Sequence, residues 1–123
     1  MNWGPKHGVK KHLSFGNLRL NLESLEVFHQ SVNLKLTPIE FKILAALVNN
    51  YPENISRENL IQTAWNSEIV LDRTVNTHLT NLRSKLPKNE LSIECCRGTG
   101  ILLRRHSYKP ISKIVDSQSI MVY

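Results

Sequence analysis

The sequence predicts an α+β domain in which a four-stranded antiparallel sheet, three helices and a β-hairpin follow one another along the chain. Three observations support this order. Residues 13–36 alternate apolar and polar side chains between turn residues, as antiparallel strands with one buried face do. Residues 37–86 contain three segments with apolar spacings of three and four, which is helical periodicity. Alternation returns after Leu91, around a turn that contains glycine.

The composition is that of one globular domain. The chain has 123 residues, of which 41% are hydrophobic, enough for a core of its own. It has no apolar run near the roughly 20 residues of a membrane span, and no apolar segment of the signal-peptide kind follows its N-terminal lysines. We therefore expect a cytoplasmic protein, with residues 1–12 a linker or leader, 13–105 the domain and 106–123 a tail of unknown role.

The expected sheet consists of four short strands whose apolar residues face one side. Turns are predicted at Gly16-Asn17, at Glu23-Ser24 and near Gln30-Ser31. The inward residues of the successive strands are Leu13 and Phe15, then Leu18, Leu20 and Leu22, then Leu25 and Val27, then Val32, Leu34 and Leu36.

Two helices are expected to follow the sheet. Thr37 as N-cap, Pro38 at the first helical position and Glu40 at the third form a capping box with the favoured proline. Residues 49–52 end this helix, and Ser56 is expected to cap the next one. The inward residues are Phe41, Leu44, Ala45 and Val48 in the first helix and Leu60, Ile61, Ala64 and Trp65 in the second.

The third helix, expected over residues 72–86, has the most informative pattern. Asp72 is predicted as its N-cap. Its apolar stripe consists of Val75, Leu79, Leu82 and Leu86. The opposite face consists of Arg73, Thr77, Thr80, Asn81 and Ser84, with Asn76 and Arg83 on one flank and Thr74, His78 and Lys85 on the other.

No acidic residue follows Asp72 in this helix. Small polar groups at its crest can therefore meet base edges in a DNA major groove, while the cations on its flanks meet phosphates. The alternative is an ordinary amphipathic helix with a solvated face, and the helix alone leaves both interpretations open.

The positive charge of the chain lies in the same region. Residues 1–72 have seven Lys or Arg and seven Asp or Glu, whereas residues 73–105 have seven basic and two acidic residues and a net charge of +5. Charge concentrated in one segment indicates a surface that binds a polyanion.

The last predicted element is a hairpin. Leu91, Ile93 and Cys95 alternate with polar residues, Arg97-Gly-Thr-Gly100 turns, and residues 101–103 return. A hairpin beside the third helix is a wing, so the order is that of a winged helix-turn-helix. Neighbouring strand residues point to opposite faces, so Cys95 and Cys96 neither pair nor jointly chelate a metal; we interpret them as small apolar residues.

Several motifs recur in the order and near the spacing of a known family. They are Leu36-Thr-Pro-Ile-Glu-Phe41, Ser56-Arg-Glu-Asn-Leu60, Trp65, Asp72-Arg-Thr-Val-Asn-Thr-His-Leu79, Leu82-Arg-Ser-Lys-Leu86 and Arg97-Gly-Thr-Gly100. Through them, residues 13–105 closely resemble the winged-helix output domain of OmpR/PhoB-type bacterial response regulators of two-component systems. The resemblance implies a transcriptional regulator that binds double-stranded promoter DNA at specific sequences, with the third helix in the major groove and the wing in the minor groove.

The resemblance and the crest of the third helix together imply individual roles. Phosphates would be held by Arg73, Thr74, His78, Arg83 and Lys85. Bases would be read by Asn76, Thr77, Thr80 and Asn81. The wing residues Arg97 and Thr99 would enter the minor groove. RNA polymerase would contact the connection of Asn66, Ser67, Glu68, Ile69 and Val70. The domain would be a monomer when free and a head-to-tail dimer on tandem half-sites.

The chain also departs from this family. The receiver domain is not in the sequence, so we expect no phosphorylation switch within it. Thr80 and Asn81 stand where many members have basic residues, Ile101 replaces the usual aromatic residue, and Cys95 stands where threonine is common. The connection before the third helix looks about one residue shorter than usual.

An enzyme and a protein-binding module are the two other function classes. The five histidines form no cluster with catalytic or metal-ligand spacing, and no glycine-rich phosphate loop follows a strand, so we expect neither an enzyme nor a metal or cofactor site. A winged helix that binds another protein instead of specific DNA remains the alternative. Retention on heparin or a DNA column in rising salt distinguishes the two.

Overall fold

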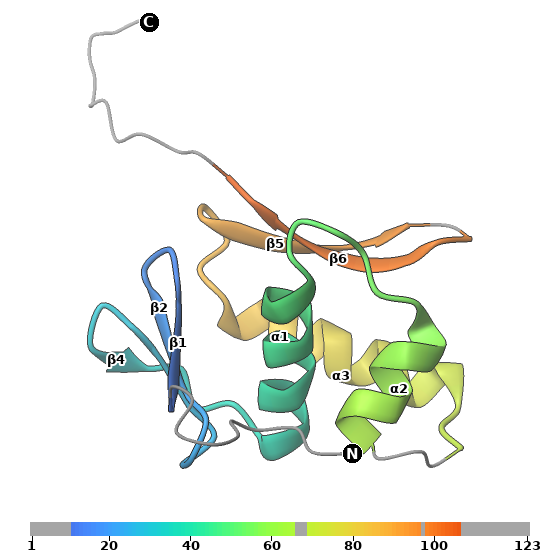
Figure 1. Ribbon diagram of the computed structural model, residues 1–123, viewed down its shortest axis with the longest axis horizontal. Helices are drawn as coiled ribbons and strands as arrows, with labels where there is room; N and C mark the ends of the chain where they lie inside the picture. Colours follow the sequence, from blue (N-terminus) through green and yellow to red (C-terminus); the bar gives the residue numbers. More distant parts are fainter. Residues whose placement is uncertain (1–10, 66–68, 97, 107–123) are drawn as a thin grey trace, which may run out of the picture.

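The computed structural model describes residues 11–65, 69–96 and 98–106. Its elements, in chain order, are β1 (His12–Phe15), β2 (Leu18–Asn21), β3 (Glu26–His29), β4 (Val32–Asn33), α1 (Pro38–Asn50), α2 (Arg57–Trp65), α3 (Asp72–Lys85), β5 (Leu91–Cys96) and β6 (Gly100–Arg105). This arrangement, drawn in Figure 1, confirms the predicted winged helix-turn-helix fold.

The first four strands form an antiparallel sheet in the order β1-β2-β3-β4. Its inner face buries Leu18, Leu20 and Val27. Leu25 was expected in the third strand, but it lies in the preceding turn with a φ of 60°, outside the extended region that a strand requires.

The fourth strand was predicted too long. Only Val32–Asn33 pair with β3, because Lys35 adopts a φ of 59° and interrupts the extended backbone. Val32 is 62% exposed instead of inward, while Leu34 and Leu36 are partly buried against the core.

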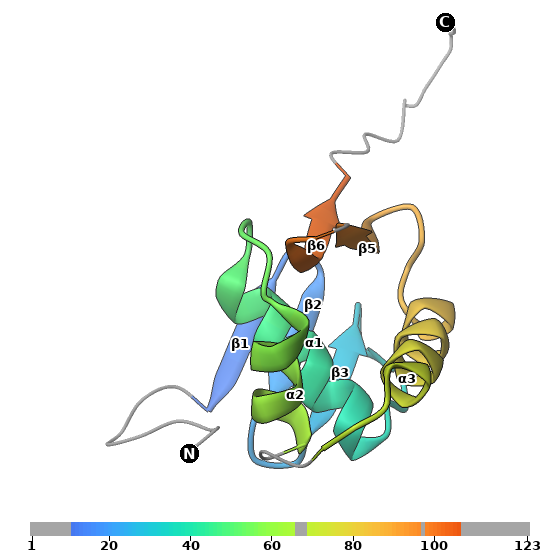
Figure 2. The ribbon, with the colours of Figure 1, turned by 90° about the vertical axis from the view of Figure 1, so that its right-hand side faces the viewer.

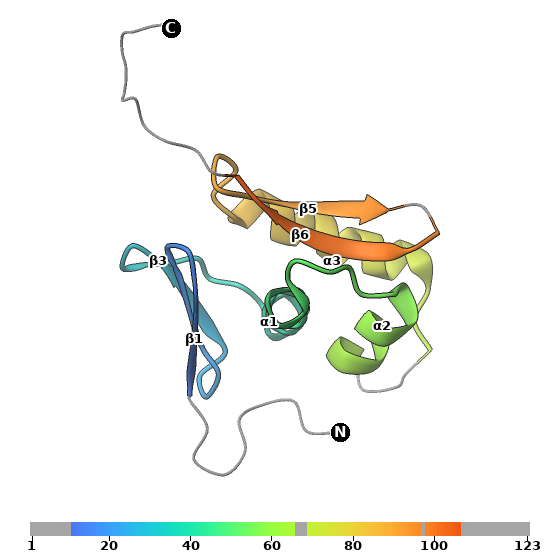
Figure 3. The same ribbon diagram turned by 45° about the horizontal axis from the view of Figure 1, so that its top comes forward.

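Helix α1 stands between the sheet and α2 and is seen end-on in Figure 3. The predicted capping box is present: the Glu40 amide donates to Thr37 Oγ1 at 3.2 Å, and the Thr37 amide donates to Glu40 Oε1 at 2.9 Å. Because α1 lies at the centre, it buries Ile43, Ala46 and Leu47 beyond the predicted stripe.

The start of α2 agrees with the sequence and the start of α3 does not. Ser56 Oγ accepts from the Asn59 amide at 3.0 Å, as expected for a cap. In α3 the N-cap is Leu71, which has no side-chain cap bond, and Asp72 is the first helical residue. Asp72 still lies at the positive end of the helix dipole. The predicted apolar stripe of α3, which comprises Val75, Leu79, Leu82 and Leu86, is buried.

The hairpin β5–β6 packs beside α3 (Figure 3). Ile93 pairs with Leu103, and both side chains are buried. Gly100 has a φ of 130°, and a Cβ there would collide with the Ile55 carbonyl, so only glycine fits this end of the turn. Cys95 was interpreted as a packed apolar residue, but it is exposed, although its cross-strand partner Ile101 is buried.

Candidate nucleic-acid interface

The exposed face of α3 forms one side of the molecule, away from β1 (Figure 2). A shallow groove runs along this face, lined by Arg73, Asn76, Thr77, Thr80 and Asn81, and all five are exposed. The structure thus brings the four residues expected to read bases onto one surface with Arg73. These residues are exposed because the opposite face of α3 packs into the core, where Val75, Leu79 and Leu82 are buried.

The side chains at the crest differ in how much they are engaged. Thr77 Oγ1 donates to the Arg73 carbonyl at 2.9 Å, so its hydroxyl can still accept a hydrogen bond from a ligand. Within the part of the chain that the structure describes, no hydrogen bond engages the side-chain amide of Asn81. Ser84 Oγ donates to the Asn81 backbone carbonyl at 2.7 Å, which leaves that side chain untouched. The Asn81 side chain is therefore available to a ligand as both donor and acceptor.

At its N-terminal end, α3 is tied to α2 by Arg57. Arg57 Nη2 donates to Asn76 Oδ1 at 2.8 Å, and Arg57 Nε lies 3.6 Å from Asp72 Oδ1. Arg57 was not predicted as a site residue, because it lies in the neutral part of the chain and only the fold places it beside α3. The Ser56-Arg57-Glu58 motif was the one available signal.

Arg83 ties α3 to the hairpin. Arg83 Nε donates to the Ile93 carbonyl at 3.1 Å, and Nη2 lies 3.4 Å from Cys95 Sγ. These contacts use part of the guanidinium, which has five N–H groups. The charge is therefore held in a fixed position with donors to spare.

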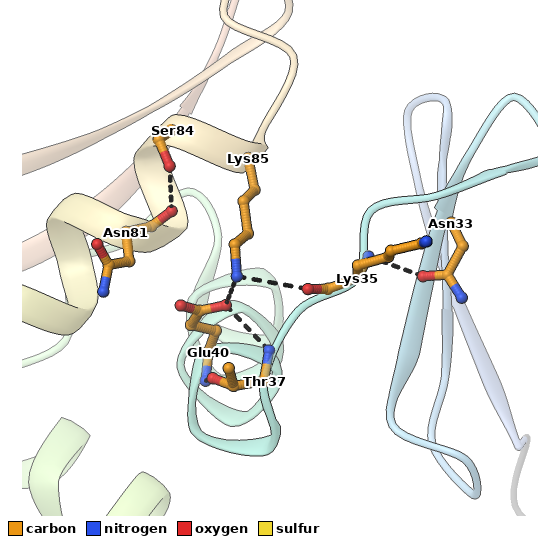
Figure 4. Close-up of polar contacts among 7 residues, drawn as sticks. All are labelled: Asn33, Lys35, Thr37, Glu40, Asn81, Ser84 and Lys85. Carbon is orange, nitrogen blue, oxygen red and sulfur yellow. Dashed lines mark hydrogen bonds and ion pairs between the residues drawn. The ribbon is translucent and has the colours of Figure 1, made fainter.

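Lys85 faces inward, onto α1. Its Nζ lies 2.7 Å from Glu40 Oε1 and 3.4 Å from the Lys35 carbonyl (Figure 4), and Glu40 is only 2% exposed. Burial alone would raise the pKa of Glu40, but the hydrogen bond and charge of Lys85, together with the bonds from Thr37, lower it below its ordinary value. Two of the three donors of the ammonium are thus used within the domain.

The other flank of α3 is partly packed. The His78 ring lies 5.5 Å from the Trp65 ring in an edge-on arrangement, and its Nδ1 is buried without a hydrogen-bond partner among the described residues. Thr74 is half-buried, and its amide donates to the Leu71 carbonyl at 3.0 Å. The His78 ring thus faces α2.

The wing and the connection before α3 are described in part. Thr99 is exposed, whereas Arg97, Asn66, Ser67 and Glu68 lie outside the described residues. Ile69 is 99% and Leu71 64% exposed, and Val70 is partly buried against the core.

Metal sites and membrane spans are two further features that the described ranges bear on. Residues 11–65, 69–96 and 98–106 contain no group of three His, Cys, Asp or Glu residues arranged to hold a metal. None of their helices combines the length and apolarity needed to span a bilayer.

Comparison with known proteins gives this face a context. A family model described as "Transcriptional regulatory protein, C terminal" matches residues 30–103. The regulatory protein VanRB of Enterococcus faecalis is 37% identical over 96 residues, covering 77% of this chain and 43% of that protein. The chain spans less than half the length of the curated relatives it matches.

Solved structures that resemble this chain include DNA-binding domains. The DNA-binding domain of CpxR from E. coli superposes with a TM-score of 0.68 at 31% identity, over 76% of this chain and 96% of that one. The DNA-binding domain of the response regulator AdeR, crystallised in complex with an intercistronic region, has a TM-score of 0.63 at 28% identity, over 76% of this chain and 99% of that one.

Proposed function

The chain belongs to the OmpR/PhoB-type family of transcriptional regulatory protein C-terminal domains, and on that premise we propose that it binds double-stranded promoter DNA at specific sequences. The observation that carries the proposal is the exposed groove of α3. It combines amides and hydroxyls with a cation, which is the mixture of groups that base edges and phosphates require. The complex of AdeR with an intercistronic region supports the proposal.

In the proposed complex, α3 enters the major groove. Thr77, Thr80 and Asn81 face the bases together with Asn76, because all four line the exposed groove. Arg73, at the same surface, binds a phosphate, and Arg57 adds a cation that comes from α2.

The flanks hold the two strands of the duplex. Arg83 is fixed against the hairpin by its bond to the Ile93 carbonyl, so it meets a phosphate without first losing side-chain freedom. Thr74 and His78 are assigned to the opposite strand. Lys85 contributes mainly through its ion pair with Glu40.

The wing and the assembly complete the proposal. Arg97 and Thr99 are assigned to a neighbouring minor groove, where a narrow A·T-rich segment attracts arginine. Two copies bind tandem half-sites head to tail, and a single copy is monomeric without DNA. The connection between α2 and α3 is proposed to contact RNA polymerase. Its exposed apolar side chains, Ile69 and Leu71, support this proposal.

The test is a selection of bound duplexes from a random pool, followed by affinity measurements on the selected and a scrambled duplex between about 50 and 200 mM salt. We expect a defined half-site and a loss of affinity by orders of magnitude over this range. Arg19, exposed on β2, provides the control, because Arg19→Ala removes the same charge far from α3. Absence of any enriched sequence, with weak dependence on salt, would reject DNA binding and favour a protein-binding winged helix.

A further inference from the structure

We propose that Arg57 decides which base edge Asn76 recognises, by holding the asparagine as a hydrogen-bond donor. The proposal rests on the proposed DNA binding and specifies its base chemistry at one position. It predicts that Asn76 selects guanine or thymine, whose major-groove oxygens accept, and disfavours adenine. The positioning residue lies on α2 and is not itself assigned a base contact.

The orientation of the Asn76 amide follows from the chemistry of its partner. A guanidinium has N–H donors and no acceptor, so the amide atom that faces it must be the oxygen. Arg57 Nη2 lies 2.8 Å from Asn76 Oδ1, which is the distance of a charge-assisted hydrogen bond. With the oxygen turned to α2, the Nδ2 group is the part of this exposed side chain left for a ligand.

The guanidinium also has an ion-pair partner on α3. Arg57 Nε lies 3.6 Å from the carboxylate of Asp72, and the Arg57 side chain is 31% exposed. One cation therefore contacts both Asp72 and Asn76, one helical turn apart on the same end of α3. Two simultaneous contacts fix the fork of the guanidinium more firmly than either would alone.

This arrangement changes what the asparagine can recognise. The usual pairing of asparagine with adenine uses both amide atoms, the oxygen accepting from N6 and the nitrogen donating to N7. An amino group of adenine or cytosine that approached Oδ1 would meet the positive charge of Arg57. Guanine presents only acceptors, O6 and N7, and thymine presents O4, so these edges suit a free Nδ2 donor.

Asn81 provides an internal contrast on the same helix. Among the described residues no hydrogen bond engages its side-chain amide, so that amide can turn to present either pattern of donor and acceptor. Two asparagines of one recognition surface are therefore expected to have different preferences. The sequence alone treats them as equivalent.

The experiment compares base preferences of variants by measuring affinities for all single-base-pair substitutions of the selected duplex. Arg57→Met keeps the length of the side chain and removes the donor, and Arg19→Ala controls for loss of one charge. Asn76→Asp keeps the acceptor for Arg57 and removes the donor for DNA. Thermal unfolding of each variant is recorded in parallel, and Asn76→Ala identifies which base pair Asn76 contacts.

We expect guanine or thymine at that base pair for the wild type and a shift of several-fold or more toward adenine in Arg57→Met, with other positions unchanged. Asn76→Asp should lose the preference as fully as Asn76→Ala does. A wild type that already prefers adenine there, or an Arg57→Met variant that weakens all duplexes equally, would overturn the proposal for Arg57. Absence of any sequence preference in the wild type would instead reject the proposed function, and this inference with it.

Discussion

The crest of α3 and the two ends of the same helix are built differently. At the N-terminal end, Arg57 joins Asp72 and Asn76 to α2. At the C-terminal end, Arg83 bonds to β5 and Lys85 to the buried Glu40 of α1. The middle of the exposed face, Thr80 and Asn81 in particular, has no such tie to another element among the described residues.

This difference indicates that the ends of α3 position the helix, while its middle is available to a partner. Ties to three neighbouring elements fix the position of α3, and the ordering of a binding surface before a ligand arrives removes part of the cost of association. The side chains between the ties stay open to a partner. Charged residues on the flanks are therefore not equivalent to one another, although their types and spacing suggested that they were.

The largest expected effect separates the buried from the exposed face of α3. Leu79 is fully buried, so Leu79→Ala should lower the free energy of unfolding by about 2–5 kcal/mol. Thr80→Ala, one residue away at the crest, should change it by about 0.5 kcal/mol or less. Denaturant unfolding checks both. Comparable losses of unfolding free energy in the two variants would mean that Thr80, like Leu79, faces the core.

The next largest effect on stability concerns the ion pair between Lys85 and Glu40 at the C-terminal end of α3. Lys85→Met removes the partner of a buried carboxylate and should destabilise the domain by about 1.5–3 kcal/mol, the size of a hydrogen bond to a charged group. Lys88→Met, at a nearby exposed position, is the control and should be close to neutral. If the two lysines behave alike, the ion pair with Glu40 contributes little.

The pH dependence of the unfolding free energy tests the same ion pair. The pKa of Glu40 in the folded domain lies below its ordinary value of 4.5, so the ionised carboxylate stabilises the fold above that pH. This contribution is lost as the pH falls through the folded-state value. Denaturant unfolding between about pH 7 and pH 3 should show wild type losing its advantage over Glu40→Gln. A difference that stays constant across the range would contradict the assignment.

The smallest effect distinguishes holding DNA from reading it. Arg83→Ala should weaken binding to selected and scrambled duplexes about equally and reduce the salt slope by roughly one unit. The reason is that Arg83 is placed on a flank, with its bond to the Ile93 carbonyl directing it along the hairpin. A change in base preference would instead place Arg83 among the reading residues.

Local signals in the sequence predicted most of the fold. The Thr37 capping box, the Ser56 cap and the stripe around Leu79 depend on residues a few positions apart, so their patterns are visible without tertiary structure. The exceptions are also local: positive φ angles at Leu25 and Lys35 changed where the third strand begins and the fourth ends, and side-chain periodicity does not report φ.

The candidate site could be predicted only as a set of exposed positions. The sequence placed Thr77, Thr80 and Asn81 at the crest of the helix. It could not show that Lys85 meets Glu40 or that Arg57 meets Asn76, because these pairs join different helices and depend on how the helices pack. The periodicity of the sequence thus predicts which residues are exposed. The packing of the helices determines which charged side chains are engaged in contacts within the domain.

Substitution of Asn81 distinguishes a helix whose open crest reads bases, while its bonded ends fix its position, from one whose crest is only a solvated face. The measurement compares Asn81→Ala with Asn89→Ala, an exposed amide in the turn before β5, on one selected and one scrambled duplex. We expect Asn81→Ala to lose about 1–3 kcal/mol of binding free energy on the selected duplex and little on the scrambled one, with Asn89→Ala unchanged on both. Equal losses on the two duplexes, or no loss on either, would contradict it.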